Sequence, residues 1–219
     1  MLPILFQDAD FVVLDKPAGL PVHPTRGGGP SVEDCFPQLS RRRTGPWLAH
    51  RLDRDTAGCL LVALRRPALL AAQACFAEGQ AEKLYWAVVR GAPPGDAGEV
   101  IAPLLKRHAP KGDGWRVVVD PAGQPARTAW RMLGRGDGIA WLELRPRTGR
   151  THQVRVHCAH LGCPVLGDAR HGGGDGPLHL LARSLELPLD PPVAATAPPP
   201  AHMLAALRAC GWDATMLRP

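Results

Sequence analysis

One short segment of this chain gathers residue types that perform acid–base or nucleophilic chemistry. Residues 50–58 read His-Arg-Leu-Asp-Arg-Asp-Thr-Ala-Gly, so that two carboxylates and two guanidinium groups fall within five positions. A carboxylate flanked by arginines is held ionised by their positive charges. An ionised carboxylate suits a nucleophile or an electrostatic stabiliser, and it suits a general acid poorly. We therefore take Asp53 as a candidate catalytic group.

Two other interpretations of this segment remain open on its residues alone. Asp53 and a neighbouring arginine could form an ion pair that only stabilises the loop. Asp53 and Asp55, two positions apart, are also the kind of pair that holds a metal ion in a nuclease. A metal nuclease usually gathers further carboxylates, and the remaining acids of this chain form no obvious set. The structural ion pair stays as well supported as catalysis at this point.

A second dense segment, residues 145–162, carries arginines and histidines where a turn leads into a predicted helix. Residues 148–151 read Thr-Gly-Arg-Thr, with Thr151 as the expected N-cap. Exposed amides at a helix start bind phosphate, and Arg147 and Arg150 lie beside these amides. The segment therefore predicts a phosphate contact, although any basic helix start shares some of these features.

The predicted helix also orients its own side chains. Val154, Cys158 and Leu161 recur at helical spacing, which places them on one buried face. Arg155 is one residue round from Val154, so it can point toward the sheet rather than away from it.

Histidines and cysteines near this helix raise the question of a metal site: His157, Cys158, His160 and Cys163. Successive helical residues diverge by about 100°, so His157 and Cys158 do not converge on one ion. No second Cys/His pair with zinc-site spacing supports such a site. We expect buried or interfacial side chains here, and no metal.

The length and composition of the chain limit the number of domains and the class of protein that we expect. The chain has 219 residues, 45% of them apolar, which suits one domain, or one domain with two lobes. No stretch is apolar for long enough to span a bilayer, and the first residues lack the pattern of a signal peptide. We expect a cytoplasmic monomer with a single domain over residues 1–219 and no membrane contact.

The net charge and the cysteines give weaker indications of the binding partner and of the redox environment of the protein. The net charge of +6 points weakly toward an anionic partner, with arginine concentrated at 41–43, 51–54 and 145–155. A GC-rich genome would enrich arginine as well, so the two explanations stand level until the motifs are weighed. Six cysteines are scattered without a Cys-x-x-Cys pair, and in a cytosolic chain we expect them to be reduced and mostly buried.

The pattern along the chain predicts closely spaced strands and few helices. Strands are expected at 11–14, 59–64, 83–91 and 139–146, and around 99–102, 115–119 and 126–133. Helices are expected after Ser31, over 67–79, from Thr151 onward and over 201–210. A Thr-Ala-Gly turn is expected at 56–58, and an irregular connection at the Pro/Ala-rich residues 188–200. This order favours an α+β fold with a mainly antiparallel sheet over a βαβ array.

Tyr85 is the only tyrosine of the chain. In a regular strand over 83–91, Leu84, Trp86 and Val88 face one side, and Tyr85 faces the other with Lys83 and Ala87. A buried core aromatic is the commoner role for such a residue, so spacing alone favours a structural role.

Five motifs in order resemble the RluA family of pseudouridine synthases, and together they cover nearly the whole chain. They are residues 10–24, 50–58, 83–91, 147–168 and 178–185. The second of them resembles the catalytic segment of the family. Three departures are visible. No basic RNA-binding module precedes the first motif, His171 stands where relatives often have an aromatic residue before the glycine, and residues 188–219 are the least similar to the family.

The resemblance implies a pseudouridine synthase fold, with a central mixed, mainly antiparallel sheet, flanking helices and a catalytic cleft. It implies that Asp53 is the essential aspartate, that Tyr85 stacks on the target base and that Arg155 pairs with the Asp53 carboxylate. Arg51 would fill the space left by the extruded nucleotide. Contacts to RNA are expected from Arg51, Arg54, Arg147, Arg150 and His152.

The implied reaction isomerises specific uridines of structured ribosomal or transfer RNA. The glycosidic bond breaks, the uracil rotates and its C5 joins the ribose, so the reaction requires no metal or cofactor. Asp53 would either attack the uracil or the sugar, or remove a sugar proton, and the sequence does not choose between these. The rival hypothesis is a non-catalytic RNA-binding protein with the same fold. The presence of Asp53, Tyr85 and Arg155 together argues against it.

Overall fold

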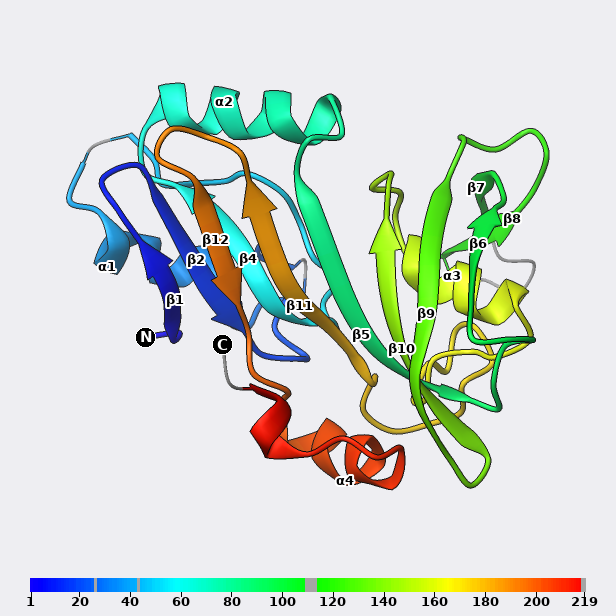
Figure 1. Ribbon diagram of the computed structural model, residues 1–219. Helices are drawn as coiled ribbons and strands as arrows, with labels where there is room; N and C mark the ends of the chain where they lie inside the picture. Colours follow the sequence, from blue (N-terminus) through cyan, green and yellow to red (C-terminus); the bar gives the residue numbers. More distant parts are fainter. Residues whose placement is uncertain (26, 43, 109–113, 218–219) are drawn as a thin grey trace. The chain divides into compact units, whose positions relative to one another are not determined.

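Strands dominate the computed structural model of the protein, which describes residues 1–25, 27–42, 44–108 and 114–217. The chain divides into two units (Figure 1). The first unit holds Met1–Leu84 and Leu181–Pro200, and the second holds Tyr85–Leu180 and Ala201–Pro219. The expectation of a single domain over residues 1–219 stays a prediction.

The first unit is built on a mixed sheet in the order β1-β2-β4-β11, with β3 beside β4 and β12 beside β11. The pairing of β4 with β11 is parallel, and the other pairings are antiparallel. The strands are β1 (Ile4–Gln7), β2 (Phe11–Lys16), β3 (Trp47–Leu48), β4 (Ala57–Ala63), β11 (Leu180–Leu187) and β12 (Val193–Thr196). The helices are a 3-10 turn (Val32–Cys35), α1 (Phe36–Leu39) and α2 (Arg66–Ala77).

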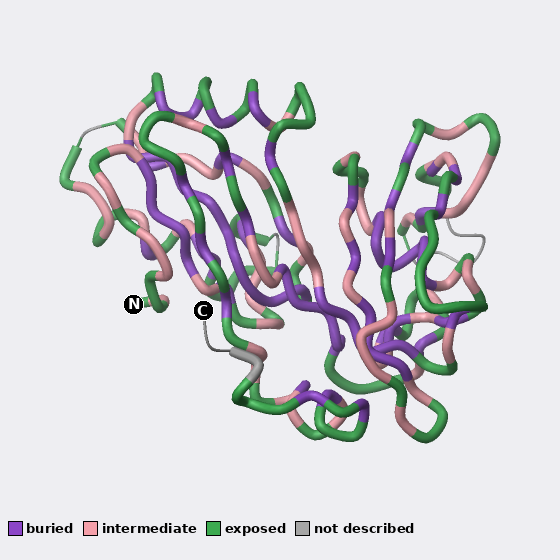
Figure 2. Tube along the Cα trace, in the orientation of Figure 1, coloured by how far each residue is buried: buried purple, intermediate pink, exposed green. Residues whose placement is uncertain are grey.

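The apolar runs of β2 and β4 form the centre of this unit. Both strands are buried along almost their whole length, as Figure 2 shows. Gly58 on β4 has φ +106°, and a Cβ there would lie 2.3 Å from the carbonyl oxygen of Ala182 on β11. Glycine therefore permits the close approach of the two parallel strands. The prediction of a turn at residues 56–58 is wrong for Ala57 and Gly58, because both residues belong to β4.

The second unit has an antiparallel sheet in the order β5-β10-β9-β6 and a separate hairpin, β7–β8. The strands are β5 (Glu82–Arg90), β6 (Ala97–Ile101), β7 (Leu104–His108), β8 (Trp115–Val119), β9 (Arg127–Gly136) and β10 (Ile139–Pro146). The helices are α3 (Gln153–His160), α4 (Ala201–Ala209) and a 3-10 turn (Ala214–Leu217).

The two faces of β5 have different surroundings. Tyr85 lies opposite Leu144 of β10, and Trp86 lies opposite Glu143. Tyr85 is half-buried at the edge of a core cluster that includes Leu144 and Val154 of α3. Trp86, on the other face, meets Trp141 edge-on, with ring centroids 4.8 Å apart. The alternation expected for 83–91 is therefore confirmed.

Most of the expected elements are present, and the differences are local. The strands at 11–14, 59–64 and 139–146 and the helices at 67–79 and 201–210 are confirmed to within a few residues. The irregular connection expected at 188–200 is wrong for Val193–Thr196, which forms β12. Val193 and Ala195 are buried and alternate with exposed residues, so tertiary pairing with β11 outweighs the local composition. β7 was not expected.

Two further findings bear on the class of the protein. None of the helices in the described part of the chain has both the length and the apolar character needed to span a bilayer. All six cysteines are free and buried, as expected for reduced thiols.

His50 fastens the segment that precedes Asp53 to the sheet. Its Nε2 accepts a hydrogen bond of 3.0 Å from the backbone N–H of Leu61 in β4, so this nitrogen carries no proton. The ring packs on Phe76 of α2, with centroids 5.1 Å apart. Burial, with the Lys83 ammonium as a second cause, lowers the pKa of His50 to about 4. The residue is therefore a neutral acceptor at physiological pH.

This hydrogen bond predicts a pH dependence of stability. The folded protein binds fewer protons than the unfolded chain between about pH 4 and the ordinary histidine pKa, so its stability falls as the pH drops through that window. The loss amounts to about 3 kcal/mol. A glutamine side chain can accept the same bond without titrating. We expect the free energy of unfolding, measured with urea, to fall less steeply with acid in His50→Gln than in the wild type; equal slopes would contradict this role.

Candidate functional site

Asp53 lies on a turn that leads directly into a buried strand. Leu52 before it is buried, and the turn is closed by a hydrogen bond of 3.2 Å from the Thr56 N–H to the Asp53 carbonyl oxygen. Asp53 is half-buried, whereas Arg51 and Asp55 are exposed. A side chain that is anchored on both sides in this way keeps a defined position, as a reactive group requires.

Lys16 joins this turn to the loop after β2. Its side chain is fully buried, and its Nζ donates to the carbonyl oxygens of Pro17, Leu20 and Arg54 at 2.9, 2.8 and 2.8 Å. Burial lowers the pKa of Lys16 to about 8, while the negative charges of Asp55 and Asp53 act in the opposite direction. A buried ammonium with satisfied donors therefore sits within the electrostatic reach of Asp53.

Two further hydrogen bonds, one of them from a side chain, complete the connection between the two loops. The Gly19 N–H donates to the Arg54 carbonyl oxygen at 3.0 Å, and the Arg54 Nε donates to the Gly19 carbonyl oxygen at 2.9 Å. Arg54 is exposed, so it is held in place by one nitrogen while the rest of its guanidinium group faces solvent. This geometry is compatible with the expected RNA contact.

In the second unit, Arg155 is buried on α3 and forms a two-pronged ion pair with Asp168. Its Nε and Nη2 donate to Asp168 Oδ2 and Oδ1, each at 2.7 Å. Burial alone would raise the pKa of Asp168, but the hydrogen bonds and the charge of Arg155, with His171 and a backbone N–H, lower it overall. Two parallel charge-assisted bonds in a buried site fix the plane of the guanidinium group. The expected pairing of Arg155 with Asp53 stays a prediction, because the two residues belong to different units.

Asp168 also organises the loop that follows it. Its Oδ1 accepts the backbone N–H groups of Arg170 and His171 at 3.1 and 3.2 Å. His171 Nε2 then lies 3.1 Å from His152 Nδ1. The carboxylate therefore connects the buried arginine to the histidine pair at the surface. His171, which stands where relatives often have an aromatic residue, therefore contacts His152.

The start of α3 differs from the expectation. The N-cap is His152, with a left-handed φ of 54°, and not Thr151. The Gln153 Oε1 accepts the Thr148 hydroxyl at 2.7 Å and the Arg150 N–H at 3.0 Å, and these two bonds fix the turn that leads into the helix. Long-range bonds from Gln153 Nε2 to Arg127 and Thr128 on β9 hold this arrangement, so tertiary contacts decided the cap.

The arginines expected to contact RNA near α3 are exposed. Arg147 directly follows β10, and its N–H donates to the Arg127 carbonyl oxygen at 2.9 Å. The Arg150 Nε donates to the Pro125 carbonyl oxygen at 3.2 Å. Of the basic loop at 41–43, Arg41 and Arg42 are exposed, and Arg43 lies outside the described residues.

Packing accounts for three of the four histidines and cysteines at 157–163, whereas His160 is exposed. His157 is fully buried, with Nδ1 at 2.8 Å from the Thr128 hydroxyl and Nε2 at 3.1 Å from the Ala102 carbonyl oxygen. Cys158 and Cys163 are fully buried in the core. Both ring nitrogens of His157 are thus engaged. Among the described residues, no group of three or more His, Cys, Asp or Glu side chains is placed to hold a metal ion.

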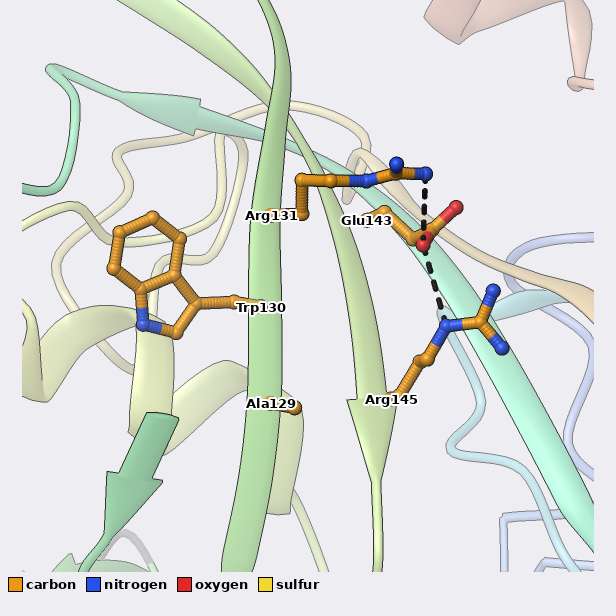
Figure 3. Close-up of a pocket in the computed structure, with 5 residues that line it drawn as sticks. All are labelled: Ala129, Trp130, Arg131, Glu143 and Arg145. Carbon is orange, nitrogen blue, oxygen red and sulfur yellow. Dashed lines mark hydrogen bonds and ion pairs between the residues drawn. The ribbon is translucent and has the colours of Figure 1, made fainter. Parts of the chain in front are cut away.

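A hollow of about 330 Å³ lies on β9 and β10 (Figure 3). Glu143 Oε1 accepts from Arg131 Nη2 at 3.3 Å and from Arg145 Nε at 3.2 Å, while Trp130 points away from this group. Because Glu143 lies opposite Trp86 and Leu144 opposite Tyr85, the hollow is on the other face of the sheet from Tyr85. The hollow is therefore not part of the surface around Tyr85.

The structure places the expected site residues in two groups. Arg51, Asp53 and Arg54 share one turn of the first unit. The second unit brings Arg150, His152 and Arg155 to one end of α3, and it holds Tyr85 on β5. Three supporting residues were not expected: Lys16, His50 and Asp168. A lysine that ends an apolar run just before Pro-Ala-Gly was the one signal in the sequence that pointed to Lys16.

Comparison with known proteins gives consistent similarities. The family described as RNA pseudouridylate synthase matches residues 10–160. An uncharacterized RNA pseudouridine synthase of Zymomonas mobilis is 44% identical over 171 residues, which cover 77% of this chain and 78% of that protein. The ribosomal large subunit pseudouridine synthase C of Vibrio cholerae is 37% identical over 169 residues, covering 77% of this chain and 52% of that protein. The matched part thus spans about half of that relative.

Solved structures resemble the whole chain. Human RNA pseudouridylate synthase domain containing 4 aligns with a TM-score of 0.79 at 29% identity, over 96% of this chain and 93% of that chain. Human RNA pseudouridylate synthase domain containing 1 aligns with a TM-score of 0.77 at 29% identity, over 96% and 87%. The expected α+β fold with a mixed, mostly antiparallel sheet is confirmed.

The buried ammonium of Lys16 predicts a large effect of its removal. Lys16→Met would leave the carbonyl oxygens of Pro17, Leu20 and Arg54 without this donor. We expect the free energy of unfolding, measured with urea at neutral pH, to fall by about 3 kcal/mol. Arg66→Met, at an exposed position of α2, is the control and should change it by less than about 0.5 kcal/mol. Similar losses in both variants would show that Lys16 does not fasten the two loops.

Proposed function

Because this chain belongs to the family of RNA pseudouridylate synthases, we propose that it isomerises specific uridines of structured RNA to pseudouridine, with Asp53 as the catalytic carboxylate. The resemblance of the five motifs to pseudouridine synthases is confirmed by the same comparisons. The substrate we propose is ribosomal or transfer RNA. Ribosomal RNA has the added support that the Vibrio cholerae relative is named for the large ribosomal subunit.

One observation carries the assignment of Asp53. Its turn is fastened on both sides, by the Lys16 ammonium to the loop after β2 and by His50 to β4. Both anchors withdraw a titratable group from water, and desolvated anchors of this kind are found where a reactive side chain must be held rigidly. A purely structural ion pair on a surface loop contributes too little to require them.

The proposed chemistry assigns one role to each of three residues. Asp53 attacks the uracil or the sugar, or removes a sugar proton. Tyr85 stacks on the target base, and its half-buried ring at the edge of the core suits this contact. Extruding a base from its stack costs on the order of a few kcal/mol, and stacking on an aromatic ring offsets roughly 1–3 kcal/mol of that. Arg155, which Asp168 orients, pairs with the Asp53 carboxylate.

The wider setting of the protein follows from this chemistry. Residues 1–219 act as one catalytic domain, monomeric and located in the cytoplasm with its RNA. Isomerisation of uridine involves no net oxidation and no net water, so we propose neither a metal nor a cofactor. Arg51, Arg54, Arg147, Arg150 and His152 contact the RNA, and Arg51 fills the space left by the extruded nucleotide.

Removal of the Asp53 carboxylate is the direct test. Asp53→Asn keeps the size of the side chain but can neither attack nor accept a proton, so we expect tritium release from C5-tritiated uridine in RNA to fall at least about 10³-fold. Circular dichroism and RNA affinity should stay unchanged. Asp55→Asn, on the same turn and exposed, is the matched control and should keep most of the activity.

Other outcomes of this assay separate the rival functions. Appreciable turnover by Asp53→Asn would refute the catalytic assignment. RNA binding by the wild-type protein without any tritium release would support a non-catalytic binding protein. Cleavage of the RNA, suppressed by a chelator, would support a metal-dependent nuclease.

Substitutions of Tyr85 test the stacking role. Tyr85→Phe keeps an aromatic face and should retain most of the activity, whereas Tyr85→Ala should lower kcat/KM about 10- to 100-fold, as expected when one base–aromatic stack is lost. The measurement is the initial rate of tritium release at limiting RNA. Equal rates for the wild type and both variants would show that Tyr85 serves only the core.

A further inference from the structure

The hairpin β7–β8 stands apart from the four-stranded sheet of the second unit but is fixed to α3. Leu104 and Val117 of the hairpin are buried with Ala126 and with Val156 of α3 in a small core of their own. Trp115 and Val119 pack against this core and are partly buried. The hairpin is therefore a rigid attachment of the helix that carries Arg155.

Cations gather on the Trp115 ring. The Lys106 Nζ lies 4.0 Å from its centroid, at a distance typical of a cation–π contact, and the Arg170 guanidinium lies 5.9 Å away. The His152 ring is 5.2 Å from the same ring. Trp115 thus holds two positively charged groups from separate segments, β7 and the loop after Asp168, in one place at the surface.

The cross-strand pairing of the hairpin is unfavourable by itself. Arg107 lies directly opposite Arg116, and like charges in that position destabilise a sheet. Asp120 forms an ion pair with Arg107. Within the described part of the chain, Arg116, Lys106 and Arg170 have no carboxylate partner. A polyanion would relieve this repulsion.

The nearest buried carboxylate does not neutralise these cations. Asp168 is engaged by Arg155 in the two-pronged pair. The pKa of His171, which follows Arg170, is lowered chiefly by burial. The negative charge of Asp168 raises this pKa, and the positive charges of Arg155, Arg116 and Arg170 lower it further. Among the described residues around this hairpin, exposed cations outnumber the carboxylates that are available to them.

We propose that this hairpin binds the phosphate backbone of the substrate RNA outside the target nucleotide. The contacts are Lys106, Trp115 and Arg170 on one face of the hairpin and Arg116 on its other face; we call these four residues the hairpin surface. The proposal rests on the proposed function, which supplies the RNA. Exposed lysine and arginine side chains that no described carboxylate pairs match a chain of phosphates, and Trp115 fixes the positions of two of them. RNA bound to this surface would be held against the segment that carries His152 and Arg155.

A triple variant tests this surface. Lys106→Gln, Arg116→Gln and Arg170→Gln are all at exposed positions, so the fold should be preserved. The probe is large-subunit ribosomal RNA transcribed in vitro, and the measurement is its Kd by filter binding over a range of salt concentrations. We expect Kd to rise about 30-fold at physiological salt, and the slope of log K against log salt to decrease by about 2, as for the loss of three phosphate contacts.

A matched control removes the same charge elsewhere. Arg66→Gln, Arg135→Gln and Arg208→Gln are also exposed, on α2, on β9 and on α4, and together they should change Kd by less than about threefold. Trp115→Phe should bind nearly as the wild type does, whereas Trp115→Leu should weaken binding about threefold because the cations lose their platform. Equal losses in the triple variant and its control would overturn the proposal.

Turnover separates this proposal from the proposed function. In the triple variant, KM for the RNA should rise while kcat at saturating RNA stays close to that of the wild type. A fall in kcat alone, with Kd unchanged, would overturn the docking role. If the wild type binds RNA through the hairpin surface but releases no tritium, the docking proposal stands and the proposed reaction fails.

Discussion

The buried ammonium of Lys16 is the interaction on which the candidate site depends most. It is fully enclosed, and it is tolerated there because three carbonyl oxygens from two separate loops accept hydrogen bonds from it. A charged group in such a position fixes the loops that supply its acceptors, since neither can move without leaving the charge unsatisfied. The turn that carries Asp53 thereby gains a rigid base, and His50 adds a second attachment to the adjacent strand.

In the second unit, too, a buried charged group fixes the chain around it, here through an ion pair of two oppositely charged side chains. Arg155 and Asp168 are both buried, and breaking such a pair by removing one partner costs far more than the pair contributes over an apolar replacement. Its value therefore lies in orientation. The pair fixes the guanidinium plane of Arg155, and the same carboxylate shapes the loop that positions Arg170 and His171. One buried contact thus defines both a candidate catalytic group and the surface beside it.

The fold was largely predictable because its strands are apolar runs bounded by glycine and proline, and because α2 and α4 have clear starts and stops. Short or polar strands were not predictable in this way. β12 lies in a Pro/Ala-rich stretch and exists because β11 offers a partner, and β7 is a basic segment that is held as a strand by its pairing with β8. Gly58 looked like a turn residue, whereas the close approach of β11 is what requires it.

The sequence by itself determined the family, the fold class and the candidate residues Asp53, Tyr85 and Arg155, because motifs of fixed spacing and residue type can be read along a chain. Only the tertiary structure decided how these residues are supported. Lys16, His50 and Asp168 act through acceptors or donors that lie far away in the sequence, as do Gln153 at the start of α3 and Trp115 on its hairpin. Burial and hydrogen-bond partners arise from the folded chain, so no local pattern encodes them.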